Sequence, residues 1–428
     1  MSAFCLYVHI PYCQAKCLYC DFNSYAAEHW PEARYVAALC AELRHYAHAA
    51  PWRGGELRTI FFGGGTPSLF TPRSIGAVLD TAQRLWPCDP DAEITLEANP
   101  GTVGVDKLRD FRVAGVNRVS FGVQSFHAHH LHRLGRIHSV DEALAIVDTA
   151  RQAGLDNIGV DLIFALPQQT VKEWERDLVQ ACALHPDHIS AYGLTYEEGT
   201  RFHTLRAEGV LRQLPEELEA AMFTGAQEIL AAHGYAQYEI SNYARPGYVC
   251  RHNLNYWRGG LYLGIGAGAH SYTRLTGRTI PNYHDDETKP ARPEEAASFQ
   301  RPPRRVPATH VGTPSGNHST AQDAGRRWSN EKTPAAYMAA VEQHGHARSA
   351  VEELTVRQAR GEFVFLGLRC LDGFAAADFH ARFGAQLPAV FPHVTELCDS
   401  GLLRCSDGRW QLTPQGVLLA DSVFATFL

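Results

Sequence analysis

The sequence predicts an α/β fold in which a parallel β-sheet is followed by a smaller C-terminal domain. Two observations predict it: six short apolar or β-branched runs occur within the first 235 residues, and stretches of helical periodicity separate them. The expected strands cover residues 6–10, 59–62, 93–96, 118–121, 157–164 and 188–192. The expected helices cover residues 32–49, 72–86, 140–153, 171–184 and 215–233. Such βα units in series form a parallel sheet with right-handed crossovers, either a curved partial barrel or an open doubly wound sheet.

Changes in composition divide the chain into four segments. Residues 1–235 carry the βα units, and residues 236–284 are rich in aromatic residues and glycine. Residues 285–327 contain six prolines and only three large aliphatic or Phe side chains, so we expect a disordered insertion that cannot offset its ordering entropy. Residues 328–428 are expected to form a helical, winged-helix-like α+β domain. Its hairpin would pair 403–405 with 409–412 around Asp407-Gly408, a strong turn signal.

Charge and hydropathy exclude several classes of protein. Lys plus Arg number 39 against 46 Asp plus Glu, a net charge of −7, and no basic run is present, which disfavours a charge-dependent nucleic-acid role. No uninterrupted apolar stretch approaches the ~20 residues of a spanning helix. The first residues do not resemble a secretory signal, so we expect a cytoplasmic protein.

Three of the eleven cysteines are the strongest chemical signal. Cys13, Cys17 and Cys20 form C-x3-C-x2-C directly after the first expected strand, whereas the odd total does not fit a disulfide framework. The spacing differs from that of structural zinc sites and of ferredoxins. Three thiolates in a reducing compartment suit an iron-sulfur cubane with one iron left open. The alternatives are incidental core cysteines, or a zinc site completed by His9 or Asp21.

Together with other motifs, this spacing resembles the radical S-adenosylmethionine (SAM) superfamily. The segments LYVHIPYCQAKCLYCDFNS, FFGGGTPS, LEANPGT, RVSFGVQSF, LGRIH and VDLIFALPQQT occur in the order found in the family of the oxygen-independent coproporphyrinogen III oxidase. The resemblance covers nearly the whole chain outside 285–327. It implies a radical SAM partial (β/α)6 barrel and a 4Fe-4S cluster on Cys13, Cys17 and Cys20, whose fourth iron is chelated by the amino and carboxylate groups of SAM.

The resemblance also implies a set of SAM-binding residues at or near strand ends. Glu97 and Arg136 suit the zwitterionic end of SAM, because a carboxylate accepts from an ammonium and a guanidinium can hold a carboxylate. Gln124 and Asp161 can accept ribose hydroxyls, and a Gly-rich turn lets backbone groups approach the methionyl ammonium. The whole set is Tyr7, Gly64, Gly65, Thr66, Glu97, Gln124, Arg136 and Asp161.

Two departures from the oxidase pattern point to one branch of the family. Phe22 stands where the oxidase carries a fourth Cys, and His252-Asn253-Leu254-Asn255-Tyr256-Trp257 gives HNxxYW. Both make the chain similar to the HemW-type haem chaperones. In that branch the implied role of His252 is to bind haem while Tyr256 and Trp257 pack on the macrocycle. Cys250 is an alternative ligand, and a hydrogen-bonded core histidine is the structural alternative for His252.

The implied partners are haem and acceptor haemoproteins such as respiratory enzymes. Peripheral membrane contact is compatible with the sequence, and a monomer and a dimer both remain open. The first hypothesis is a haem chaperone without catalytic residues of its own. The second is a coproporphyrinogen III oxidase that uses a 5'-deoxyadenosyl radical to decarboxylate two propionates. A radical enzyme with another substrate is a third.

Overall fold

The computed structural model describes residues 3–274 and 324–428. Two compact units are present, one formed by Met1–Tyr272 with Trp328–Val351 and the other by Thr273–Arg327 with Glu352–Leu428. No helix among the described residues is both long and apolar enough to cross a membrane.

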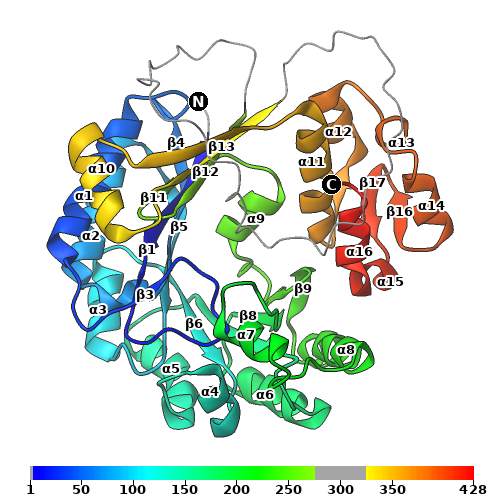
Figure 1. Cartoon of the computed structure of the whole chain (residues 1–428), viewed down its shortest axis with the longest axis horizontal. Coiled ribbons are helices and arrows are strands. Elements are labelled where there is room, and N and C mark those ends of the chain that lie inside the picture. Colours follow the sequence, from blue (N-terminus) through cyan, green and yellow to red (C-terminus); the bar gives the residue numbers. More distant parts are fainter. Residues whose placement is uncertain (1–2, 275–323) are drawn as a thin grey trace. The chain divides into compact units, whose positions relative to one another are not determined.

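The first unit is built on the predicted parallel sheet. Its neighbouring strands β1, β4, β5, β6, β7 and β8 are all parallel, which confirms the six expected βα units. These strands are β1 (Ala3–Ile10), β4 (Glu56–Gly64), β5 (Cys88–Ala98), β6 (Arg118–Gln124), β7 (Ile158–Phe164) and β8 (His188–Gly193). The helices that connect them cover the outer face of the curved sheet (Figure 1).

The connecting helices are α1 (Glu32–Ala47), α2 (Pro72–Leu85), α3 (Val105–Val113), α4 (Ala128–Leu134), α5 (Val140–Gln152), α6 (Val171–Ala183), α7 (Arg201–Ala207) and α8 (Glu216–Ala232), with the short η1 (Pro67–Leu69). Five of them, α1, α2, α5, α6 and α8, lie where apolar periodicity predicted them, and the structure adds α3, α4, α7 and the short η1. Side chains alternate along each strand, so Leu6 and Val8 of β1 enter the helix-covered core while Tyr7 and His9 lie on the other face. The inner face is the one that carries the polar groups.

The aromatic segment 236–284 is part of the sheet as far as the structure describes it. It contributes β9 (Ala236–Glu239), β10 (Asn242–Ala244), β11 (Tyr262–Ile265) and β12 (His270–Arg274). Strand β10 pairs antiparallel with β8, and β11 pairs parallel with β1, so both edges of the six-strand core are extended. Between them, α9 (Arg251–Trp257) lies on the inner side of the curved sheet (Figure 1).

The predicted insertion 285–327 lies outside the described residues except for its last four positions. Of these, Gly325 to Arg327 begin β13 (Gly325–Asn330), which corrects the expected disorder there. The physical reason is ion pairing, which amino-acid composition does not reveal. Guanidinium nitrogens of Arg327 lie 2.7 Å from a carboxylate oxygen of Glu352 and 2.7 Å from one of Glu362.

In the structure, the first unit continues beyond residue 328, where the sequence predicts the start of the C-terminal domain. Residues 328–351 belong to the first unit. They include the second half of β13, all of α10 (Pro334–His344), which packs against α1, and the start of β14 (Arg348–Glu353). In the sheet β13 lies between β12 and β14.

The second unit has the expected helices and hairpin. Strands β16 and β17 pair Ser406 with Arg409, so Asp407 and Gly408 form a two-residue turn in which both have positive φ (51° and 72°). Strand β15 pairs with β17. The elements of the second unit are α11 (Val356–Arg369), β15 (Phe374–Ala375), α12 (Ala376–Phe383), α13 (Leu387–Val390), α14 (Val394–Asp399), β16 (Leu403–Ser406), β17 (Arg409–Leu412), α15 (Pro414–Leu418) and α16 (Ala420–Ala425).

A buried carboxylate ties the late elements of the first unit to its first helix. Glu42 of α1 is fully buried and accepts hydrogen bonds from Gly266 N, Asn330 Nδ2 and the Tyr337 hydroxyl at 2.8–3.1 Å. Burial raises the pKa of Glu42 to about 7, against the opposing effect of these donors. Glu42 therefore joins α1, β13 and α10.

We expect Glu42→Gln to lower the apparent melting temperature by several degrees. The amide nitrogen would face donors that now bond to a carboxylate oxygen, and each unsatisfied buried donor costs roughly 1–3 kcal/mol. Differential scanning calorimetry measures the shift. Arg44→Gln, an exposed position on the same helix, is the control and should melt like the wild type.

Candidate functional site

The three clustered cysteines lie at the carboxyl end of the parallel sheet. Cys13 ends β2 (Tyr12–Cys13), which follows β1 directly and pairs with β3 (Tyr25–Ala26). The intervening loop is held by Lys16, whose ammonium donates to Phe22 O at 2.7 Å and to Ser24 O at 3.0 Å. Polar groups at this end of a barrel are typical of a functional site.

A chain of hydrogen bonds links the cysteines to neighbouring strand ends. The Thr66 hydroxyl donates to Cys13 Sγ at 3.7 Å and accepts from Asn99 Nδ2 at 2.9 Å. The Arg136 guanidinium donates to Asn99 Oδ1 and, at 3.5 Å, to Cys17 Sγ. Asn99 therefore contacts both side chains that donate to the sulfurs, Thr66 and Arg136. Hydrogen bonds and a nearby cation favour thiolates, the form that binds metal.

The geometry of the thiols argues against the zinc alternative. A tetrahedral zinc ion holds thiolate sulfurs about 3.8 Å apart, given Zn–S bonds of ~2.3 Å. Among the described residues the three sulfurs do not all come within 4.8 Å of one another. His9 bonds through Nδ1 to the Tyr7 hydroxyl and through Nε2 to Asn23 O, and Asp21 is exposed. The spacing therefore favours a group larger than a single ion.

Two inward carboxyl groups, Glu97 and Asp161, lie in the interior next to the cysteines. Burial, with a smaller contribution from the charge of Asp161, raises the pKa of Glu97 to about 8. The pKa of Asp161 is also raised by burial, although Ser120 donates to its two oxygens at 3.2 and 3.3 Å. A cationic ligand near Glu97 would relieve this unfavourable burial. SAM, with an ammonium and a sulfonium, fits that electrostatic environment.

The glycines of the β4 turn are required by contacts within the chain. A Cβ atom on Gly64 would lie 2.5 Å from the His9 ring, and one on Gly65 would lie 2.6 Å from Tyr12 O. Gly64 also has φ of +115°, a conformation that favours glycine. The amide of Gly64 donates to Glu97 at 3.2 Å, so the turn positions that carboxylate.

In the part of the chain that the structure describes, Gln124 has a free hydrogen-bond acceptor for a ligand, whereas the guanidinium of Arg136 already has partners. Gln124 has φ of 71° at a strand irregularity, and its buried Oε1 has no hydrogen-bond partner among the described residues. Such an orphaned acceptor fits a hydroxyl of a bound cofactor. Arg136, expected to hold a carboxylate of SAM, instead contacts Cys17, Asn99 and Gly122 O. Tyr7 stacks on Phe61 at 6.2 Å beside Glu97.

His252 lies deep in the inner face of the sheet. Its side chain is 1% exposed, its Nδ1 lies 2.6 Å from Thr59 Oγ1 and its Nε2 lies 2.9 Å from the Tyr256 hydroxyl. Its ring also stacks on Phe61 at 5.0 Å. Burial lowers the pKa of His252 to about 3, so the imidazole is neutral. In this conformation His252 is a hydrogen-bonded core residue, which corresponds to the structural alternative.

Glu93 holds the segment that carries His252, and the sequence analysis missed it. The carboxylate accepts from the backbone N–H groups of Arg251 and His252 at 2.9 and 3.0 Å, and from the Cys250 thiol at 3.6 Å. Cys250 is fully buried, and burial raises its pKa to about 12, which disfavours the thiolate needed for a haem ligand. A charged residue four positions before Glu97 in the same strand, and so on the same face of the sheet, was the available signal.

Comparisons with known proteins agree with this geometry. Residues 7–180 match the Radical SAM superfamily, and residues 354–419 match the HemN C-terminal domain. The "Heme chaperone HemW" of Bacillus subtilis (strain 168) is 34% identical over 99% of this chain and 98% of that protein. The chain belongs to the HemW family. The "Heme chaperone HemW" of Escherichia coli (strain K12) is 36% identical over 99% of this chain and 97% of its own length.

A solved structure confirms the fold of this HemW-family chain. The coproporphyrinogen III oxidase HemN from Escherichia coli aligns with a TM-score of 0.75 over 100% of this chain and 90% of that chain. At 21% identity this likeness shows the radical SAM fold alone. Membership of the superfamily implies a 4Fe-4S cluster and SAM, and the residues around Cys13, Cys17 and Cys20 fit both groups.

We expect substitution of any one clustered cysteine by Ala to strongly impair cluster assembly. The family resemblance implies that these three thiolates are the protein ligands of the cluster, so Cys17→Ala should reduce bound iron well below the about four atoms of a cubane. Iron and sulfide analysis of anaerobically purified protein measures it. Cys405→Ala removes an exposed thiol from the second unit and should leave the iron content unchanged. Full iron content in a triple Cys variant would contradict the assignment.

Proposed function

We propose that the protein binds haem and delivers it to acceptor haemoproteins, with a 4Fe-4S cluster and SAM bound at the cysteine site. The observation that carries the proposal is the likeness over 99% of the chain to proteins named as haem chaperones from two distant bacteria. Acceptors such as respiratory enzymes, peripheral membrane contact and a cytoplasmic location stay predictions. The same holds for a monomeric or dimeric state.

The side chain at position 22 supports a chaperone over the oxidase. Phe22 is 65% exposed and follows Cys20 by two residues, where the oxidase pattern has a further thiol. The loop thus carries three half-buried thiols together with two exposed large apolar side chains, Leu18 and Phe22. Such an exposed aromatic residue is suited to contact an apolar ligand or partner.

We also propose roles for the residues around the cysteines. Glu97 accepts from the ammonium of SAM, Gln124 and Asp161 accept from ribose hydroxyls, and Tyr7 lies beside the cofactor. Gly64, Gly65 and Thr66 keep the β4 turn close to Cys13. Because Arg136 already donates to Cys17, we assign it to the cluster as well as to the carboxylate of SAM. When bound, the cluster and SAM together supply one-electron chemistry.

His252 is the proposed axial ligand of haem, in a conformation that differs from the one described here. The neutral imidazole is the form that ligates iron. Ligation through Nε2 requires the Tyr256 hydroxyl to release it, since the two atoms lie 2.9 Å apart. Substitution of Tyr256 therefore separates a ligand role for His252 from a purely structural one.

We expect His252→Ala to weaken haem binding by about tenfold or more, with an altered Soret band. Tyr256→Phe frees Nε2 and should bind haem at least as tightly as the wild type, while Cys17→Ala should keep most of the affinity. Haem titration followed by absorbance measures all four proteins. Identical spectra and affinities for the wild type and His252→Ala would refute the ligand role.

The alternative function is oxidation of coproporphyrinogen III, the activity named for HemN, whose fold this chain shares. We expect no conversion to protoporphyrinogen IX when the reconstituted protein is incubated anaerobically with coproporphyrinogen III, SAM and a reductant. Chromatography of the porphyrins measures it, with authentic HemN as the positive control. Conversion with stoichiometric consumption of SAM would overturn the chaperone proposal.

A further inference from the structure

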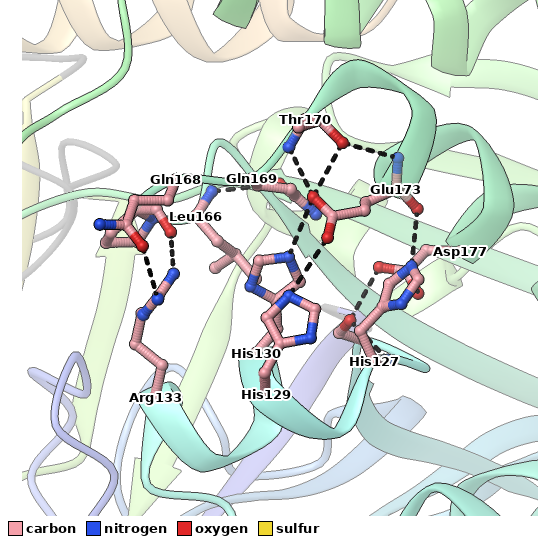
Figure 2. A network of polar contacts seen from close by, with 12 residues as sticks. His127, His129, His130, Arg133, Leu166, Gln168, Gln169, Thr170, Glu173 and Asp177 are labelled. Carbon is pink, nitrogen blue, oxygen red and sulfur yellow. Dashed lines mark hydrogen bonds and ion pairs between the residues drawn. The ribbon is translucent and has the colours of Figure 1, made fainter.

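Two histidines of α4 and a glutamate of α6 form a cluster apart from the cysteines. Figure 2 shows His129 and His130 directed toward Glu173. One potential ligand atom from each of the three residues lies within 4.8 Å of the others. Nε2 of His129 is 3.2 Å from Glu173 Oε1, and Nε2 of His130 is 3.7 Å from Glu173 Oε2. Each carboxylate oxygen thus faces one imidazole.

The position of Glu173 is fixed by the start of its helix. Thr170 and Glu173 form a capping box, in which Glu173 Oε2 accepts from both Thr170 N and Thr170 Oγ1 at 2.8 Å. Although burial acts in the opposite direction, these bonds and the nearby imidazoles lower the pKa of Glu173 to about 2. The cluster therefore has a charged, immobilised carboxylate.

His130 supplies an independent observation that points to a ligand. Its side chain is 1% exposed, and neither of its ring nitrogens has a hydrogen-bond partner among the described residues. Buried polar atoms are nearly always paired, and an unpaired one calls for an explanation. A metal ion on Nε2 would provide its missing partner.

We propose that His129, His130 and Glu173 bind a divalent transition metal, with zinc as the ion that fits the donor set best. Two imidazoles and one carboxylate are typical zinc ligands, and tetrahedral zinc sets its nitrogen and oxygen ligands about 3.3 Å apart. The two imidazole-carboxylate separations, 3.2 and 3.7 Å, are already close to this value. A three-residue set leaves a fourth position for water or a ligand.

Neighbouring groups define which residues belong to the site. Asp177 is occupied, because its oxygens accept from Ser125 Oγ at 2.8 Å and Phe126 N at 2.7 Å. The side chain of His129 is 54% exposed, which gives an ion a route from solvent. The remaining imidazole nearby, His127, lies 3.2 Å from Glu173 O through its Nε2.

A metal here would brace the cysteine loop. Helix α4 ends at Leu134, whose carbonyl accepts from Leu18 N at 3.1 Å, and two residues later Arg136 donates to Cys17 Sγ. An ion that joins α4 to the first turn of α6 would restrain the element that carries both contacts. The site would therefore be structural support for the cluster loop, with a free coordination position facing solvent.

Zinc binding by the full-length chain tests the proposal. Wild type, His129→Ala, Glu173→Gln and the control His132→Ala, exposed on the same helix, are stripped with chelator and equilibrated with zinc chloride in dialysis. Since the cysteines are unchanged in all four proteins, zinc bound there cancels in the comparison. His129 is exposed and Gln can replace Glu in a capping box, so folding of both variants is preserved.

The wild type and His132→Ala should bind one more equivalent of zinc than His129→Ala, and should gain melting temperature on zinc addition. Glu173→Gln should bind that equivalent at least tenfold more weakly, because an amide oxygen is a poorer ligand than a carboxylate. Equal stoichiometry and affinity in the wild type and His129→Ala would overturn the proposal. The proposal would also be overturned if zinc raised the melting temperature of the wild type no more than that of His129→Ala.

Discussion

Polar groups buried on the inner face of the parallel sheet are the constraint on which the rest of the first unit depends. A carboxylate removed from water is costly unless hydrogen bonds or opposite charges compensate it. Glu93 is compensated by the first amides of α9 and lies near the buried Arg118, whereas Glu97 has one amide as hydrogen-bond partner and faces Asp161. Hydrogen bonds from α9 thus compensate the carboxylate in the amino half of the interior, whereas in the carboxyl half, beside the cysteines, the pKa values of Glu97 and Asp161 remain raised despite the charge of Arg118.

This asymmetry explains the places of the cofactor site and of α9. Helix α9 fills the satisfied half, where its His252 bonds to Thr59 and its first amides bond to Glu93. The other half offers Glu97, Asp161 and the orphaned oxygen of Gln124. A cationic, hydroxyl-bearing molecule complements these three groups.

Much of the fold could be predicted from sequence because six strands in series each carry a strong apolar signal. The strands β9 to β12 were missed, since their pairing depends on edges of the sheet that are distant in sequence. The clustering of Cys13, Cys17 and Cys20 is visible in the sequence, and their role as cluster ligands stays a prediction. The role of Asn99 could not, because only the folded chain brings Thr66 and Arg136 to either side of its amide. For His252, a motif pattern cannot reveal that both ring nitrogens have partners.

The way Lys16 holds the cysteine loop has a consequence for divergence within this superfamily. Its ammonium donates hydrogen bonds to the main-chain carbonyl oxygens of Phe22 and Ser24, a group that every amino acid possesses. The loop therefore keeps its shape whatever side chain is present at position 22. A lineage can exchange cysteine for phenylalanine there without refolding the loop, so related proteins can acquire different chemistry around an unchanged cluster scaffold.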